Sequence, residues 1–221
     1  ALERAESASR RRWLLTCLEA HRDGLGPQLV ARLPGKPWFV VRNLLTLLGS
    51  QPTLPEGFTP EPWAEHEDPR VRREAYRLLL ANPGWRSGAI LRGVSDGDPQ
   101  IVRLALGAAQ SDCPVELPAR LFELLRDRLR DPEDRAAAIR LLGRRPSPVV
   151  RDWLVSQASV VRGIAWFRYR RLASKSPDML ASLGVLASHF AGHPEVAKVL
   201  AQARQSGDPD VAAAVQPPAG R

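Results

Sequence analysis

The chain has 221 residues, of which 44% are hydrophobic and 25% charged, and this composition excludes an intrinsically disordered or a collagen-like protein. Its formal net charge of +8 favours an anionic partner, and all but three of its 32 basic residues are arginines. No apolar run is long enough to span a membrane, and two cysteines cannot build a disulfide framework or a four-cysteine zinc site. We therefore expect a cytoplasmic protein with no membrane insertion.

The first helix is expected near the start of the chain. Trp13, Leu14, Cys17 and Leu18 follow helical spacing within residues 10–20, so we expect an N-terminal capping helix within residues 1–26.

A recurring frame then dominates the sequence. It consists of Asp-Pro followed by apolar residues at helical spacing. The aspartate can cap free backbone amides, and proline suits the first helical position because its missing N–H would have had no partner there. The frame predicts helices that begin at an aspartate; copies occupy residues 68–75, 98–105 and 131–138, with an earlier related copy at 38–45 and a truncated one at 208–215.

Second helical segments lie between these copies. Turn signals such as Asn82-Pro83-Gly84 separate the segments, and we find no alternation of apolar and polar residues long enough to predict a strand. Paired helices with a period near 30 residues bury their apolar faces by stacking on one another, which predicts an all-α solenoid. The second segments span residues 87–94, 117–129, 149–155 and 180–190.

The motif Asp-Pro-x-Val-Arg-x-x-Ala, clearest at Asp68 to Ala75, resembles that of HEAT-repeat proteins of the bacterial type. The resemblance covers residues 27–173. It implies a right-handed alpha-alpha superhelix of about five helix pairs, whose motif helices line the concave side and whose Asp and Arg residues form a ladder between repeats. We expect HEAT-like repeats over 27–175, a C-terminal helical cap over 176–215 and a disordered tail at 216–221.

The copies depart from the motif in three places. Asp134-Arg135 stands where Val-Arg is expected, and Val102 occupies the arginine position of its copy. Residues 50–62 contain four prolines and a glycine where a full first helix should stand, so we expect a short or irregular repeat there.

Residue patterns for catalysis and metal binding are weak. His66-Glu67 is similar to the His-Glu pairs of one di-iron HEAT-repeat hydroxylase family, but the pair occurs once and favours an exposed turn. Cys17 and Cys113 have no neighbours that mark a nucleophile, and we find no phosphate-binding glycine loop. We therefore predict no enzyme activity, no catalytic residue, no metal ligand and no cofactor.

Basic residues at helical spacing are the best functional candidates. Two sets of basic residues recur at i, i+3 and i+7, and Arg140 and Arg144 form a shorter pair, so each set is expected on one face of its helix. Between Asp152 and Asp178 no acidic residue occurs, and aromatic residues lie among the arginines. Such a composition could bind phosphates through arginine and stack bases on the aromatic rings. The alternative is a solvated basic face with aromatics in the core, where Val161, Ala165 and Leu172 would form an inward stripe. The candidate binding residues are Arg70, Arg73, Arg77, Arg140, Arg144, Arg168, Arg171 and Lys175.

The preferred hypothesis is a non-catalytic scaffold or adaptor that binds a protein partner with an acidic segment on its concave surface. The alternatives are a nucleic-acid-binding module that uses the same basic residues and a regulatory domain of a longer protein. A solenoid offers a wide, shallow surface and few enclosed pockets, which favours binding over catalysis.

Overall fold

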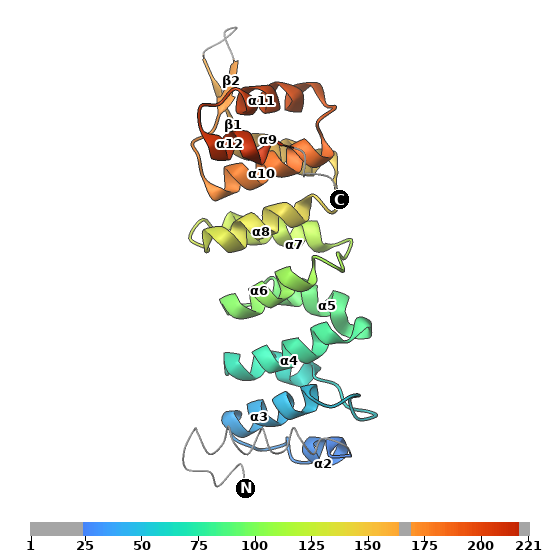
Figure 1. Ribbon diagram of the computed structural model, residues 1–221. Helices are drawn as coiled ribbons and strands as arrows, with labels where there is room; N and C mark the ends of the chain where they lie inside the picture. Colours follow the sequence, from blue (N-terminus) through green and yellow to red (C-terminus); the bar gives the residue numbers. More distant parts are fainter. Residues whose placement is uncertain (1–23, 164–168, 217–221) are drawn as a thin grey trace. The chain divides into compact units, whose positions relative to one another are not determined.

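The computed structural model describes residues 24–163 and 169–216, and this part of the chain is mostly helical with neighbouring helices packed together (Figure 1). The all-α helical-repeat fold expected from the sequence is therefore confirmed. The chain divides into two compact units, Ala1–Ala105 and Leu106–Arg221. The expected capping helix at residues 10–20 lies outside the described residues, as does the tail after Gln216.

Unit 1 is built around helix α4. Helices α2 and α3 pack on each other, and α3, α5 and the 3₁₀ helix η2 all pack on α4. The only regular element in residues 50–62 is the start of η2, which confirms the irregular repeat predicted from the prolines. The elements of this unit are α2 (Gly26–Val30), α3 (Trp38–Gly49), η2 (Glu61–Glu65), α4 (Pro69–Ala81), α5 (Pro83–Gly93) and the beginning of α6 (Pro99–Ala108).

Unit 2 is built around helix α10, which packs against α8, α9, α11 and α12. Helix α7 packs on α8, so the α7–α8, α9–α10 and α11–α12 neighbours all form contacting pairs. The helices of this unit are α7 (Leu117–Arg126), α8 (Pro132–Leu142), α9 (Pro148–Ala158), α10 (Pro177–His189), α11 (Pro194–Arg204) and α12 (Pro209–Ala214).

The helix starts follow the predicted capping chemistry. The side chain of Asp68 accepts a hydrogen bond from the amide of Arg70, at 2.9 Å, and a proline follows the aspartate at the first helical position. Asp131 and Asp208 cap α8 and α12 in the same way. Asparagine and serine perform the same function before other prolines, which the aspartate frame had missed: Asn82 caps α5, Ser147 caps α9 and Ser176 caps α10.

Between α9 and α10 the chain forms an antiparallel β-hairpin, which corrects the helical interpretation at Val161 and at residues 169–172. Strand β1 (Ser159–Arg162) pairs with β2 (Tyr169–Leu172), and Val161 lies opposite Arg170. The predicted inward stripe does not form at Val161, whose side chain is 52% exposed. Ala165, like Arg168 and the aromatic residues Trp166 and Phe167, lies outside the described residues.

Among the described residues, no helix is both long and apolar enough to cross a membrane.

Candidate functional site

The three predicted basic residues of α4 lie on that helix, and each has a carboxylate partner. Arg70 pairs with Asp68 at 2.8 Å, and its guanidinium carbon lies 3.5 Å from the ring centre of Trp38, which adds a cation–π contact. Arg73 pairs with Asp98 at 2.6 Å, and Arg77 pairs with Glu74. The positive charges of this face are therefore balanced locally.

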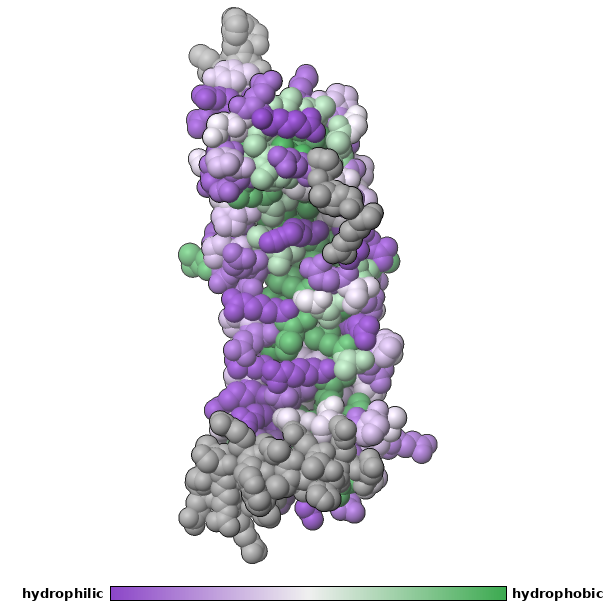
Figure 2. Space-filling model, in the orientation of Figure 1, coloured by the Kyte–Doolittle hydropathy of each residue, from purple (hydrophilic) through white to green (hydrophobic). Residues whose placement is uncertain are grey.

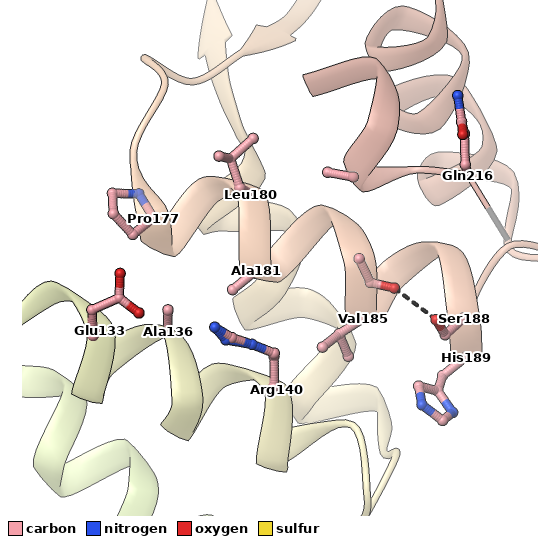
Figure 3. A pocket seen from close by; sticks show the side chains of 12 residues that line it. Glu133, Ala136, Arg140, Pro177, Leu180, Ala181, Val185, Ser188, His189 and Gln216 are labelled. Atoms are coloured by element: carbon pink, nitrogen blue, oxygen red, sulfur yellow. Dashed lines mark hydrogen bonds between the residues drawn. The ribbon is translucent and has the colours of Figure 1, made fainter. Parts of the chain in front are cut away.

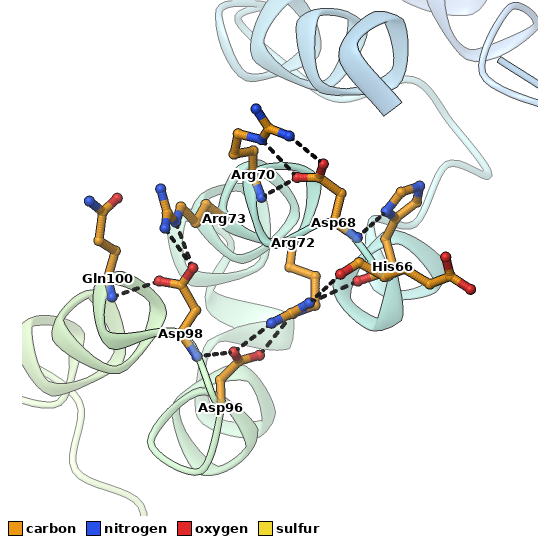
Figure 4. A network of polar contacts seen from close by, with 9 residues as sticks. His66, Asp68, Arg70, Arg72, Arg73, Asp96, Asp98 and Gln100 are labelled. Atoms are coloured by element: carbon orange, nitrogen blue, oxygen red, sulfur yellow. Dashed lines mark hydrogen bonds and ion pairs between the residues drawn. The ribbon is translucent and has the colours of Figure 1, made fainter. Parts of the chain in front are cut away.

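A further arginine of α4, Arg72, organises the network shown in Figure 4. Arg72, the arginine of the Val-Arg motif, donates to Asp96 and to the backbone carbonyls of His66 and Glu67. Asp96 in turn accepts from the amide of Asp98 at 2.7 Å. Successive copies are thus in contact in unit 1, but not through the expected pair: the motif arginine Arg72 reaches Asp96 in the turn, and the capping Asp98 of the next copy is reached by Arg73 instead.

Two capping aspartates of this network have lowered pKa values. The side-chain hydrogen bond from Arg70 lowers the pKa of Asp68 to about 2. Burial alone would raise the pKa of Asp98, but the hydrogen bonds from Arg73 and from the amides of Gln100 and Ile101 outweigh it, and the net direction is downward. Both carboxylates are held in the charged form, and their role here is structural.

His66 lies in the turn before Asp68, as expected. Its Nδ1 accepts a hydrogen bond from the amide of Asp68 at 2.9 Å, so the ring helps to shape the start of α4. Within residues 24–163 and 169–216, no three His, Cys, Asp or Glu side chains gather as a metal site requires.

The third predicted basic set does not share a helical face. Arg168 lies outside the described residues, Arg171 lies on strand β2, and Lys175 lies in the segment before α10. Helical spacing was inferred because residues 168, 171 and 175 also fit the i, i+3, i+7 pattern. Arg162 and Tyr169 instead lie opposite each other in the antiparallel strand pair.

Lys175 is engaged by the C-terminal helix. Its ammonium group lies 2.8 Å from Asp208 and 2.6 Å from Asp210, at the start of α12. The hydrogen bonds that its ammonium group donates to these two carboxylates raise the pKa of Lys175, and the same contact lowers the pKa of Asp208. Lys175 therefore fastens α12 to the segment that precedes α10.

In the remaining predicted pair, Arg140 lies on α8 and Arg144 lies in the turn just after that helix. Arg144 donates to the backbone carbonyl of Gln110. Arg140 makes no hydrogen bond or ion pair within the described part of the chain. It extends into an open groove between α8 and α10, where Figure 3 shows its guanidinium lying below Ala181.

This α8–α10 groove has a volume of about 680 Å³. Its lining is mainly apolar, and Figure 2 shows hydrophobic surface between hydrophilic side chains over these helices. Two titratable side chains accompany Arg140, namely Glu133 in the first turn of α8 and His189 in the last turn of α10. They lie at opposite ends of the groove (Figure 3). The apolar lining comes mostly from Ala136, Pro177, Leu180, Ala181, Val185 and Ala214.

Sequence reasoning identified Arg140 but missed the apolar residues beside it. The sequence predicted a helix at Leu180 and Val185 but not which helix packs beside it. The groove forms only where α8 and α10 lie next to each other. A signal was present in the small residues that face each other across the groove, Ala136 on α8 and Ala181 on α10, because small side chains leave space between packed helices.

Compared with known proteins, the chain matches no protein-family model and no curated protein significantly.

Proposed function

We propose that this chain is a non-catalytic, HEAT-like repeat scaffold that binds a segment of another protein in the α8–α10 groove. The observation that carries the proposal is Arg140, whose guanidinium has no partner among the described residues and lies in a mainly apolar, open groove. An arginine recognises a carboxylate through two parallel hydrogen bonds, and apolar surface beside it favours an aliphatic or aromatic side chain. The partner segment therefore has an acidic residue next to an apolar one.

The lining of the groove supports binding more than catalysis. General acid–base chemistry needs titratable groups that converge on one reacting atom. Glu133 and His189 lie at opposite ends of the groove, and Ser188 donates its hydroxyl proton to the carbonyl of Gly184 at 2.9 Å. The described lining thus offers one cation and an apolar surface, which suits recognition of a short peptide segment.

The basic face of α4 supports the nucleic-acid alternative less well. Because Arg70, Arg73 and Arg77 each pair with a carboxylate of the same chain, a phosphate would have to displace that carboxylate. The proposal therefore rests on Arg140 rather than on the net charge.

A peptide selection tests the proposal. Random 16-residue peptides displayed on phage are selected on the immobilised protein, and the affinities of the recovered peptides are then measured by fluorescence anisotropy. We expect sequences that combine Asp or Glu with a large apolar residue, and at least tenfold weaker binding to Arg140→Glu and to Leu180→Asp. Arg120→Glu is the matched control, because Arg120 is exposed on α7 and does not line the groove.

Two results would contradict the proposal. One is a set of selected peptides without acidic residues. The other is equal weakening by Arg140→Glu and Arg120→Glu, which would mean that charge alone governs the binding. Thermal unfolding of each variant shows whether the fold is retained.

A further inference from the structure

The β-hairpin presents one face that is exposed along both strands. In an antiparallel pair, directly opposite residues lie on the same face. Val160 lies opposite Arg171 and Arg162 lies opposite Tyr169, so these four side chains share a face. All four are exposed, Tyr169 by 55% and Val160 by 36%.

The base of the hairpin is fixed to the helices of unit 2. Strand β2 packs against α11, and Gln202 of α11 donates to the carbonyl of Arg170 at 2.9 Å. Ser159 donates to the carbonyl of Val155 at 2.8 Å and accepts from Arg170 at 3.3 Å. An isolated two-stranded ribbon is marginal in water, so these contacts hold the exposed face in position.

The arginines of this hairpin face lack the carboxylate partners that the arginines of α4 have. Within the described residues, neither Arg162 nor Arg171 has an ion pair or a side-chain hydrogen bond. The sequence contains no Asp or Glu between Asp152 and Asp178. On α11, Lys198 stands one turn before Gln202 and is also exposed, which adds a third cation on the side of α11 that faces β2.

A shallow recess lies beside these cations. It measures about 490 Å³ and is lined by Tyr169, Arg170, Arg171, Leu172 and Gln202. An exposed aromatic ring beside arginines is the arrangement by which proteins stack unpaired bases and hold the phosphates that join them. The exposed amide of Gln202 can in addition donate to or accept from a base edge.

We propose that the hairpin and the adjacent surface of α11 bind single-stranded nucleic acid. Tyr169 stacks on a base, and Arg162 and Arg171 contact the flanking phosphates. A lipid surface fits the described strands less well, because Val160 shares its face with two arginines and so no continuous apolar face is available for insertion.

Fluorescence anisotropy with labelled 12-nucleotide oligo(dT) and oligo(U) tests this proposal at 50 and 200 mM NaCl. We expect the double variant Arg162→Ala/Arg171→Ala to bind at least tenfold more weakly, with a slope of log affinity against log salt smaller by about 1.4. Tyr169→Ala should weaken binding by about fivefold or more. The matched control is Arg70→Ala/Arg77→Ala, which removes two charges that are already paired on α4 and should change affinity by less than twofold.

The proposal is overturned if neither oligonucleotide binds, or if the α4 double variant loses as much affinity as the hairpin double variant. It is also overturned if vesicles of phosphatidylglycerol and phosphatidylcholine bind through the same hairpin residues while the oligonucleotides do not. The altered side chains are exposed, and circular dichroism and Tm establish that the variants are folded.

Discussion

Arg135 of α8 forms an ion pair with Asp178 of α10 in which the arginine side chain is only 5% exposed. The Nε atom of Arg135 lies 3.1 Å from Oδ2 of Asp178. The same guanidinium donates to the carbonyl of Leu125 at 2.8 Å and to that of Asp127 at 2.7 Å. One side chain therefore joins the end of α7 and the start of α10 to the helix that carries it.

Arg135 occupies the position in its copy that Arg72 occupies in the copy at Asp68, four residues after the capping aspartate. Both arginines donate to two carbonyls of the preceding segment and to one carboxylate of a later one. The motif arginine is thus a structural residue that holds consecutive segments together. This explains why the Asp131 copy retains the arginine although it lacks the preceding valine.

We predict that Arg135→Met lowers the free energy of unfolding by about 3–5 kcal/mol, because it leaves a carboxylate and two carbonyls without their buried donor. Asp178→Asn should also destabilise the protein, and the double variant should lose less than the sum of the two single losses. Urea denaturation followed by circular dichroism measures all three. A loss below about 1 kcal/mol for Arg135→Met would contradict this role.

Two glycines of α5 provide a matched test of helix packing. A Cβ atom placed on Gly93 would lie 2.8 Å from the Cβ of Ala105 and 3.2 Å from the ring of Tyr76, whereas one on Gly88 would meet nothing within 4 Å. We predict that Gly93→Ala destabilises the protein by about 1–3 kcal/mol through overpacking. Gly88→Ala should leave stability unchanged or raise it by up to about 1 kcal/mol, because alanine favours the helix. If both substitutions change the stability equally in thermal or urea unfolding, Ala105 and Tyr76 do not pack closely against Gly93.

The local features of this fold could be predicted from sequence, and the long-range ones could not. Capping by Asp68 or Asp131 depends on atoms within three residues, so the Asp-Pro frame located these helix starts well. The partners of Arg73 and Arg135 lie 25 and 43 residues away along the chain, and helical spacing carries no information about them. Of the predicted binding cations, Arg73 and Lys175 proved to be paired with distant carboxylates, and Arg70 and Arg77 with carboxylates two and three residues away. Arg140 has no such partner among the described residues.

The hairpin was missed for a different reason. Its strands have four residues each, too short for an alternating pattern to stand out from the helical spacing of the same region. The base of the hairpin is held by contacts with α9 and α11, and the sequence of the strands gives no sign of this support.

The lowered pKa values of the capping aspartates predict a specific pH dependence. A carboxylate whose pKa is lower in the folded state stabilises the protein fully above its unfolded pKa, near 4, and this contribution is lost as the pH falls through the folded value. For Asp68 the loss extends to about pH 2. Asp98 shifts in the same direction, so its contribution also declines below pH 4.

We therefore predict that Asp98→Asn is less stable than the wild-type protein at pH 7, and that the difference narrows between pH 4 and pH 2. Protonation of Asp98 in the wild type removes the charge that the substitution has already removed. Urea midpoints of the two proteins at pH 7, 4 and 2.5 measure the difference. If the stability difference between the two proteins stays constant over this range, the pKa of Asp98 does not change on unfolding.

Lys175 should contribute much less than Arg135 to the free energy of unfolding of the whole protein. Its side chain is 43% exposed, so water screens its ion pairs. We predict that Lys175→Met shifts Tm by no more than about 2 °C. Hydrogen exchange in α12 should nevertheless become faster, because Lys175 pairs with Asp208 and Asp210 at the start of that helix.

The wild-type protein in 1 M NaCl should show the same faster exchange, since salt weakens exposed ion pairs. Lys198→Met is the control, because it removes an exposed lysine of α11 that has no ion pair among the described residues. If amide exchange in α12 is equally fast in Lys198→Met and Lys175→Met, the contacts with Asp208 and Asp210 do not hold this helix in place.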